Sequence, residues 1–106
     1  SYNKVGDVLV AQGDLEGALK SYKDSLAIGD RLTRISPGNV YRLRDLAANF
    51  AKLAHVYQLS GYSGTALRAL RQGHEILSRV AKLSPDNATW KRDLAWFDGR
   101  IKELAP

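Results

Sequence analysis

The stretch SPGNVYRLRDLA at residues 36–47 returns as SPDNATWKRDLA at residues 84–95, which is 48 residues later. In both copies a proline stops the preceding segment, because its ring cannot extend a helix without the loss of a hydrogen bond. The asparagine two residues after the proline can accept hydrogen bonds from the free amides of a following helix and act as its N-cap. The stretch therefore predicts a helix, a tight turn and a second helix, twice in one chain.

The same 48-residue shift aligns the chain far beyond this turn. Of the 58 residue pairs that it aligns, 14 are identical. They include Gly13 and Gly61, which interrupt the helical pattern, and the small residues Ala18 and Ala66. A fixed period of this length marks a chain built from stacked copies of one supersecondary unit. We therefore predict an all-α repeat array.

The helices themselves are read from apolar residues that recur at helical spacing, with the breakers between them. About five helices are expected, and no strand pattern competes. In the first copy an apolar stripe begins at Leu15 and is closed by Leu32 and Ile35. The later helices are expected over residues 40–60, 65–83 and 88–104.

We expect a single domain in three parts, namely a first repeat over 1–39, a second over 40–87 and a capping helix over 88–106. Residue 1 aligns with Asn49 in the middle of a helix, so the first copy is expected to lack the start of its first helix and the natural protein to continue upstream. At the other end, Asp98 and Lys102 replace Phe50 and Ala54. Polar residues suit an outer face on which nothing stacks, so the array is expected to end there.

The composition of the chain limits the classes of function that it can have. With 106 residues, of which 44% are apolar, the chain can bury the core of one domain. The sequence shows neither a membrane span nor a signal peptide, so we expect a cytoplasmic protein without a membrane partner. Cysteine is absent, which excludes disulfides and thiolate chemistry within this sequence. Most of the +5 formal charge lies in residues 40–87, where seven basic side chains face three acidic ones.

The repeats resemble the tetratricopeptide family. The residues that fit its pattern of large and small positions are Tyr2, Val5, Gly6, Leu9, Ala18, Tyr22 and Ser25, and then Phe50, Leu53, Ala54, Tyr57, Ala66, Leu70 and Gly73. The usual period of that family is about 34 residues, so the chain is similar to variants with longer helices. The resemblance implies an α-solenoid of antiparallel helical hairpins that form a right-handed superhelix.

The resemblance also implies that the first helix of each hairpin lines a concave groove, where an extended or helical peptide binds. Helical spacing places the candidate residues on one face: Asn3, Asp7, Arg44, Lys52, His55, Gln58, Trp96 and Arg100. The residues that differ between copies are the better site candidates, which favours His55, Gln58 and Trp96. The alternatives are that these side chains are only solvated and that Trp96 covers the end of the core.

Some members of the family clamp the terminal carboxylate of a partner with basic and amide side chains. Lys52 and Arg100 suit that chemistry, as do Asn3 and Lys4 on the first helix. Asp7 and His55, however, stand where an amide or a cation would help, so a faithful clamp is not expected. The Arg-Asp pairs at 44–45 and 92–93 occur in both copies, which favours a role in the stacking of units, such as an ion pair between repeats.

A basic stripe follows the second helix of the second copy and consists of Arg68, Arg71, Arg79 and Lys82. It could bind nucleic acid or an anionic surface weakly, through phosphates or acidic lipid, but no aromatic residues interleave with it, as stacking on single-stranded bases would require. A solvated face is therefore the favoured interpretation, and nucleic acid is not the expected partner.

Signals of catalysis are poor. His55 and His74 are the only histidines, and they fall on different helices without a matching carboxylate spacing, so neither a metal site nor an enzyme is expected and no cofactor is implied. The favoured function is a scaffold that binds a protein or peptide. The alternative is a self-associating structural module, in which Val5, Val8 and Leu9 form an open edge that pairs with a second copy.

Overall fold

The computed structural model describes the backbone of residues 2–106, and within them the fold is all-α. Its five helices are α1 (Tyr2–Ala11), α2 (Leu15–Ile35), α3 (Val40–Leu59), α4 (Ser63–Leu83) and α5 (Ala88–Leu104). The sequence placed these elements correctly, with one helix starting two residues later and another ending one residue later than observed. The described residues contain no strand, which confirms the all-α part of the prediction, whereas the repeat-array arrangement stays a prediction.

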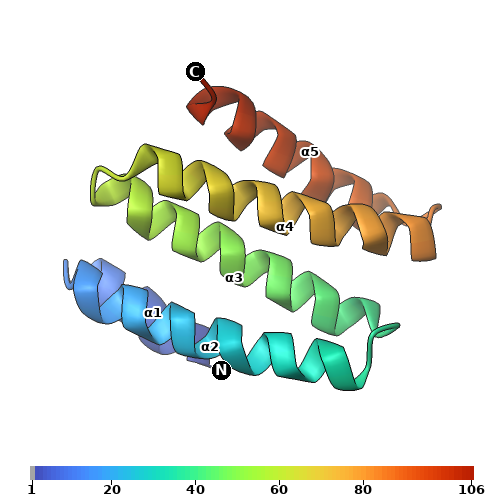
Figure 1. Cartoon of the computed structure of the whole chain (residues 1–106), viewed down its shortest axis with the longest axis horizontal. Coiled ribbons are helices and arrows are strands. Elements are labelled where there is room, and N and C mark those ends of the chain that lie inside the picture. The colour runs from blue at the N-terminus through green and yellow to red at the C-terminus, as the bar shows by residue number, and fades with distance from the viewer. Residues whose placement is uncertain (1) are drawn as a thin grey trace.

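Helices α2 to α5 follow one another across the molecule in chain order, with α1 behind α2 in this view, and the successive helices α2 to α5 run in opposite directions (Figure 1). The main packing contacts join α1 to α2, α2 to α3, α3 to α4 and α4 to α5. The result is a slab of 38 × 33 × 19 Å, in which α3 has neighbours on both sides. Helix α3 is therefore the element around which both faces of the molecule are built.

The turns form as their local sequence dictates. Asn39 caps α3, where its side-chain oxygen accepts from the amides of Tyr41 and Arg42 at 3.1 and 3.2 Å. Asn87 caps α5 in the same way, with a bond of 2.9 Å from the Thr89 amide. Helices α1 and α3 end before glycines in the left-handed region, with φ of +80° at residue 13 and +85° at residue 61, which a residue with a Cβ adopts only with strain. Both features were predicted.

The core depends on small residues where two helices approach closely. Ala18 and Ala66 are fully buried at equivalent positions of the two copies. On α1, Gly6 lies directly against the ring of Tyr22, and an added Cβ would collide with that ring. Small residues thus allow the helices to pack closely at these positions.

One part of the predicted core is wrong. Ile35 is 71% exposed and Leu32 is also exposed, although both were expected to close the apolar stripe of α2. The buried face of that helix instead runs through Tyr22, Ser25 and Thr33, whose spacings of three and eight residues keep them on one side of the helix. Thr33 satisfies its hydroxyl locally by donating to the Asp30 carbonyl oxygen at 2.8 Å, so a polar residue takes the place expected of a leucine.

The contact of α2 with α3 and the equivalent contact of α4 with α5 are made by different kinds of residue. Between α2 and α3, buried Asn49 donates to the Ser25 hydroxyl at 3.1 Å. Forty-eight residues later, between α4 and α5, the corresponding residues are Gly73 and Phe97, and the ring of Phe97 packs directly on the glycine. The first contact is a hydrogen-bonded polar pair, and in the second an aromatic ring packs against a glycine, which has no side chain.

Candidate functional site

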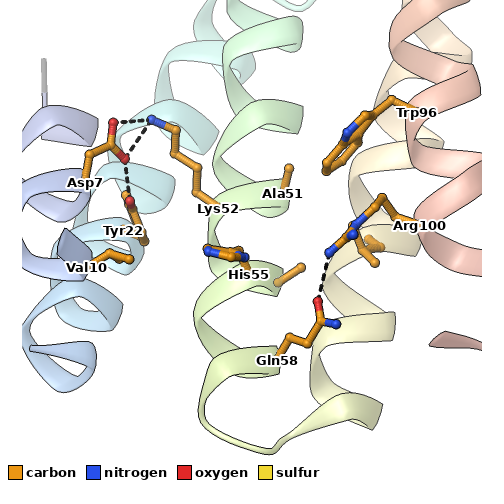
Figure 2. Close-up of a pocket in the computed structure, with 11 residues that line it drawn as sticks. Asp7, Val10, Tyr22, Ala51, Lys52, His55, Gln58, Trp96 and Arg100 are labelled. Atoms are coloured by element: carbon orange, nitrogen blue, oxygen red, sulfur yellow. Dashed lines mark hydrogen bonds and ion pairs between the residues drawn. The ribbon is translucent and has the colours of Figure 1, made fainter. Parts of the chain in front are cut away.

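A pocket of about 370 Å³ opens between α1, α3 and α5, with α2 and α4 behind it (Figure 2). Its apolar floor and polar walls come from residues that are far apart in the sequence. The lining consists of Asp7, Val10, Tyr22, Ala51, Lys52, Ala54, His55, Gln58, Leu70, Trp96 and Arg100. Because the odd-numbered helices each present one face to it, side chains one or two turns apart on α3 reach the same pocket.

The first wall joins α1 to α3 through an ion pair. The Lys52 ammonium donates to both carboxylate oxygens of Asp7, at 2.9 and 2.8 Å, and the Tyr22 hydroxyl donates to the same carboxylate. Burial alone would raise the pKa of Asp7, but the hydrogen bonds from Lys52 and Tyr22 outweigh it and hold the pKa below its usual value. Burial, together with the bond to Asp7, raises the pKa of Tyr22 above its usual value. In this wall Asp7 is therefore ionised and Tyr22 is protonated at neutral pH.

The second wall joins α3 to α5. The Arg100 guanidinium donates to the Gln58 side-chain oxygen at 2.9 Å and to Glu103 at 3.1 Å. It also lies over the ring of Trp96, 5.8 Å from the ring centre. Trp96 stands edge-on to Phe97 with ring centres 5.0 Å apart, yet it remains 49% exposed. The two interpretations of Trp96 therefore describe one residue, which touches the core and keeps about half of its surface exposed at the pocket.

His55 lies between the two walls (Figure 2). It is exposed, and among the described side chains none forms a hydrogen bond or ion pair with it. The floor beside it is formed by Val10, Ala51 and Leu70. The pocket thus combines apolar surface with a ring nitrogen that can donate to or accept from a ligand.

A second pocket of about 260 Å³ continues the first along α3 and shares Ala51, Lys52 and Trp96 with it. At its far end the Arg44 guanidinium donates to the Asp93 carboxylate at 2.8 Å and lies 5.4 Å from the ring centre of Trp90. The hydrogen bond to Asp93 raises the pKa of Arg44. We call the two pockets together the α3 groove. The ion pair between α3 and α5 agrees with the stacking role inferred from the repeated Arg-Asp sequence.

The structure brings together most of the residues that the sequence proposed. The pocket is lined by Asp7, Lys52, His55, Gln58, Trp96 and Arg100, whereas Arg44 lies in the adjoining pocket. Asn3 does not line either pocket, and its side-chain oxygen accepts from the Ser25 hydroxyl at 3.0 Å. The binding role of these residues stays a prediction.

The pocket is also lined by Tyr22, Ala54 and Leu70, which the sequence did not propose as site residues. The apolar pattern assigned them to the core, which is correct for their burial, but it could not show that a core ring also faces a pocket. The carboxylate clamp finds no support in the geometry, because the ammonium of Lys52 is bonded to Asp7 and the guanidinium of Arg100 to Glu103.

The basic stripe on α4 is exposed as expected, but one inference about it is wrong. Aromatic residues do lie beside it, because α3 brings Phe50 and Tyr57 next to Arg68 and Arg71. Arg79 lines a neighbouring pocket that Phe50 also lines, whereas Lys82 lines none of the pockets described. Periodicity along a single helix could not reveal neighbours supplied by another.

His74 is half-buried, and it has a carboxylate partner that the sequence spacing did not reveal. Its Nε2 lies 2.8 Å from the Asp98 carboxylate, across the contact between α4 and α5. The pair lies outside both pockets of the α3 groove.

No protein-family model matches the chain, and no curated protein is significantly similar to it. Of the described helices, none is long and apolar enough to cross a membrane. Within residues 2–106, no three His, Asp or Glu side chains gather closely enough to hold a metal ion. The function of the groove therefore has to be inferred from its own geometry.

Proposed function

We propose that the chain is a tetratricopeptide-like interaction module that holds a segment of another protein in the α3 groove. The observation on which this rests is the half-exposed ring of Trp96, which stands over an apolar floor between two polar walls. Large aromatic side chains in partly enclosed sites supply much of the binding energy of protein interfaces. The helical array would then be a short solenoid whose odd-numbered helices form the binding face.

The walls are held in place before a ligand arrives. Lys52 bonds Asp7 across α1 and α3, and Arg100 bonds Gln58 across α5 and α3. Binding a segment between walls that are already ordered loses less conformational entropy than ordering them on contact. This arrangement favours a groove that recognises one shape over a surface that adapts to many.

The same bonds argue for binding over catalysis. A general acid or base must be able to reach the substrate, but Asp7 and Lys52 are engaged with each other, and Arg100 is engaged with Gln58 and Glu103. His55 is the one titratable side chain lining the first pocket that lacks a partner among the described residues. A lone exposed histidine with no orienting carboxylate suits a hydrogen bond to a ligand better than a proton-transfer role.

The test is a peptide-display selection on the wild-type chain, followed by affinity measurements on the selected peptides. Replacing Trp96 by Ala should weaken binding about 30-fold, the equivalent of about 2 kcal/mol for a central aromatic contact. A variant with His55→Ala and Gln58→Ala should weaken it further. Lys102→Ala, an exposed change on α5 outside the groove, should have no effect. Selected peptides that bind the Trp96→Ala chain as well as the wild type would refute the groove as the site.

A second function, self-association, is favoured by one observation. Val5 and Val8 lie nearly one helical turn apart on α1 and are 56% and 54% exposed, so they form a small apolar surface. Leu9, proposed for the same edge, instead packs against the core. Sedimentation equilibrium of the wild type and of a Val5→Lys, Val8→Lys variant decides the matter. A mass that rises with concentration only in the wild type supports pairing through this edge, and a monomer at every concentration rejects it.

A further inference from the structure

A second groove lies on the other side of α3, between α2 and α4. Three adjoining pockets of about 430, 440 and 260 Å³ all include Phe50, so they form one continuous depression, which we call the α2–α4 groove. The side chains of α3 that face it include Leu46, Leu53 and Tyr57. These fall on the opposite side of the helix from the residues of the α3 groove, so each groove can be occupied without the other.

The charges along this groove are unevenly distributed. At the end nearest the turn between α3 and α4, it is lined by three cations and no acidic side chain, because Lys23 comes from α2 and Arg68 and Arg71 from α4. Among the described residues, none of the three forms an ion pair. Cations left without a carboxylate around an apolar floor attract a partner that supplies the opposite charge.

The other end of the groove is electrically balanced. Asp30 pairs with Arg34 at 3.1 Å, and Glu75 and Arg79 lie on the facing helix. Between the two ends the floor is formed by Phe50 and Leu26, both only partly buried. The groove therefore has a polarity, with a cationic end, an apolar middle and a neutral end.

We propose that the α2–α4 groove is a second binding surface, which takes an acidic amphipathic segment of a protein. The apolar side chains of the segment lie over Phe50 and Leu26, and its carboxylates meet Lys23, Arg68 and Arg71. The charge polarity fixes the direction of the segment, with its acidic end toward the turn between α3 and α4. This site is independent of the α3 groove and does not rest on the function proposed for it.

The geometry favours a protein segment over nucleic acid. Stacking of bases requires open ring faces. Tyr57 has the Lys23 ammonium over its ring, 6.0 Å from the centre, and Phe50 is packed against the core cluster. The rest of the floor at this end is aliphatic, from Leu26 and Leu53. Such a floor accepts apolar side chains, whereas a nucleic acid held only by the three cations would leave it empty.

The experiment uses two display libraries of peptides with apolar residues at helical spacing. In one library the remaining positions are Asp or Glu, and in the other they are Lys or Arg. Selection on the wild-type chain is expected to enrich the acidic library alone. Equal enrichment of both libraries, or enrichment of neither, overturns the proposal.

Affinities of the enriched peptides are then measured by fluorescence anisotropy on three variants. The first replaces Lys23, Arg68 and Arg71 by Gln and should weaken binding about tenfold or more, because it removes the charges of the cationic end. The second is Gln72→Trp, in which an exposed residue on the edge of the groove is enlarged to fill it without a change in the core. It should weaken binding to a similar extent.

The matched control removes three exposed cations that do not line the groove, with Arg31→Gln, Lys82→Gln and Lys91→Gln. It should bind like the wild type, and an equal loss in this control would show a nonspecific charge effect and overturn the site. A labelled single-stranded oligonucleotide is run in parallel. If it displaces the peptides and binds the Gln72→Trp variant undiminished, the face binds nucleic acid and the proposal is wrong. The Trp96→Ala variant should bind the acidic peptides normally, which separates this test from that of the α3 groove.

Discussion

The close approach of α4 and α5 leads to a prediction about two glycines. An ideal Cβ on Gly73 would lie 2.5 and 2.8 Å from two ring carbons of Phe97 and 3.2 Å from the Ala47 carbonyl oxygen. Phe97 is only 4% exposed, so its ring cannot swing out to solvent. An alanine inside a helix is favoured over glycine by about 1 kcal/mol. Overpacking of a core contact, however, costs about 1–3 kcal/mol, so Gly73→Ala should be neutral to destabilising by about 2 kcal/mol.

Gly99 in α5 provides the matched comparison. A Cβ added there has no atom within 4 Å, so Gly99→Ala should gain the helix-propensity term alone and stabilise the chain by about 0.5–1 kcal/mol. The free energies of unfolding of the two variants should therefore differ by about 1–3 kcal/mol. Urea titrations followed by circular dichroism measure both, and equal slopes are expected because the exposed surface is the same. If Gly73→Ala proves as stable as Gly99→Ala, the close contact is wrong.

Three further predictions follow from the bonds that join the helices. A double-mutant cycle on Arg44→Ala and Asp93→Ala should give a coupling of about 0.2–1 kcal/mol that falls with salt, as expected of a partly exposed pair; zero coupling in low salt would contradict the ion pair. The pKa of Tyr22 in the folded chain lies above its usual value of 10.0, so the protonated hydroxyl stabilises the fold below pH 10.0, and stability should fall as the pH rises above that value. Tyr22→Phe should lose that part of the alkaline dependence, and an unchanged pH profile would argue against the bond to Asp7. Asn49→Phe alone should destabilise the chain by about 1–3 kcal/mol, whereas adding Ser25→Gly, which copies the contact between α4 and α5, should restore most of the loss; a double variant no better than the single one would show that the two contacts are not equivalent.

The elements were predictable because their signals are local. Asn39 and Asn87 cap helices through amides two and three residues away, and Gly13 and Gly61 end helices through their own backbone angles. Both kinds of signal are read from a few adjacent residues, and neither needs the rest of the fold. The 48-residue shift added a second copy of each signal, which made the turns stand out.

The packing could be predicted only in part. Ile35 is as apolar as a core residue, but it falls on the side of α2 turned away from the buried face, which passes instead through Thr33. The pairing of Ser25 with Asn49 depends on how far α3 lies from α2, and no sequence pattern gives that distance. The burial of Ser25 and Asn49 as a pair could therefore not be predicted without the positions of the two helices.

The candidate site, like the packing, could be predicted only in part. Helical spacing was sufficient to place His55 and Gln58 on one face, and the 48-residue register aligned Lys52 on α3 with Arg100 on α5. It could not show that Lys52 is neutralised by Asp7, because the two lie 45 residues apart on different helices. Nor could it reveal the α2–α4 groove, whose lining comes from three helices.

The central claim is that the α3 groove holds a protein segment, and the two tryptophans of the chain allow a direct test by nuclear magnetic resonance. Trp96 is 49% exposed in the groove, whereas Trp90 is 4% exposed and buried in the core. When a display-selected peptide is titrated into the isotope-labelled chain, the account predicts that the indole signal of Trp96 shifts together with the amides around His55, while the indole signal of Trp90 stays in place. A tight-binding peptide that leaves the signals of Trp96 and its neighbours unchanged would contradict the account.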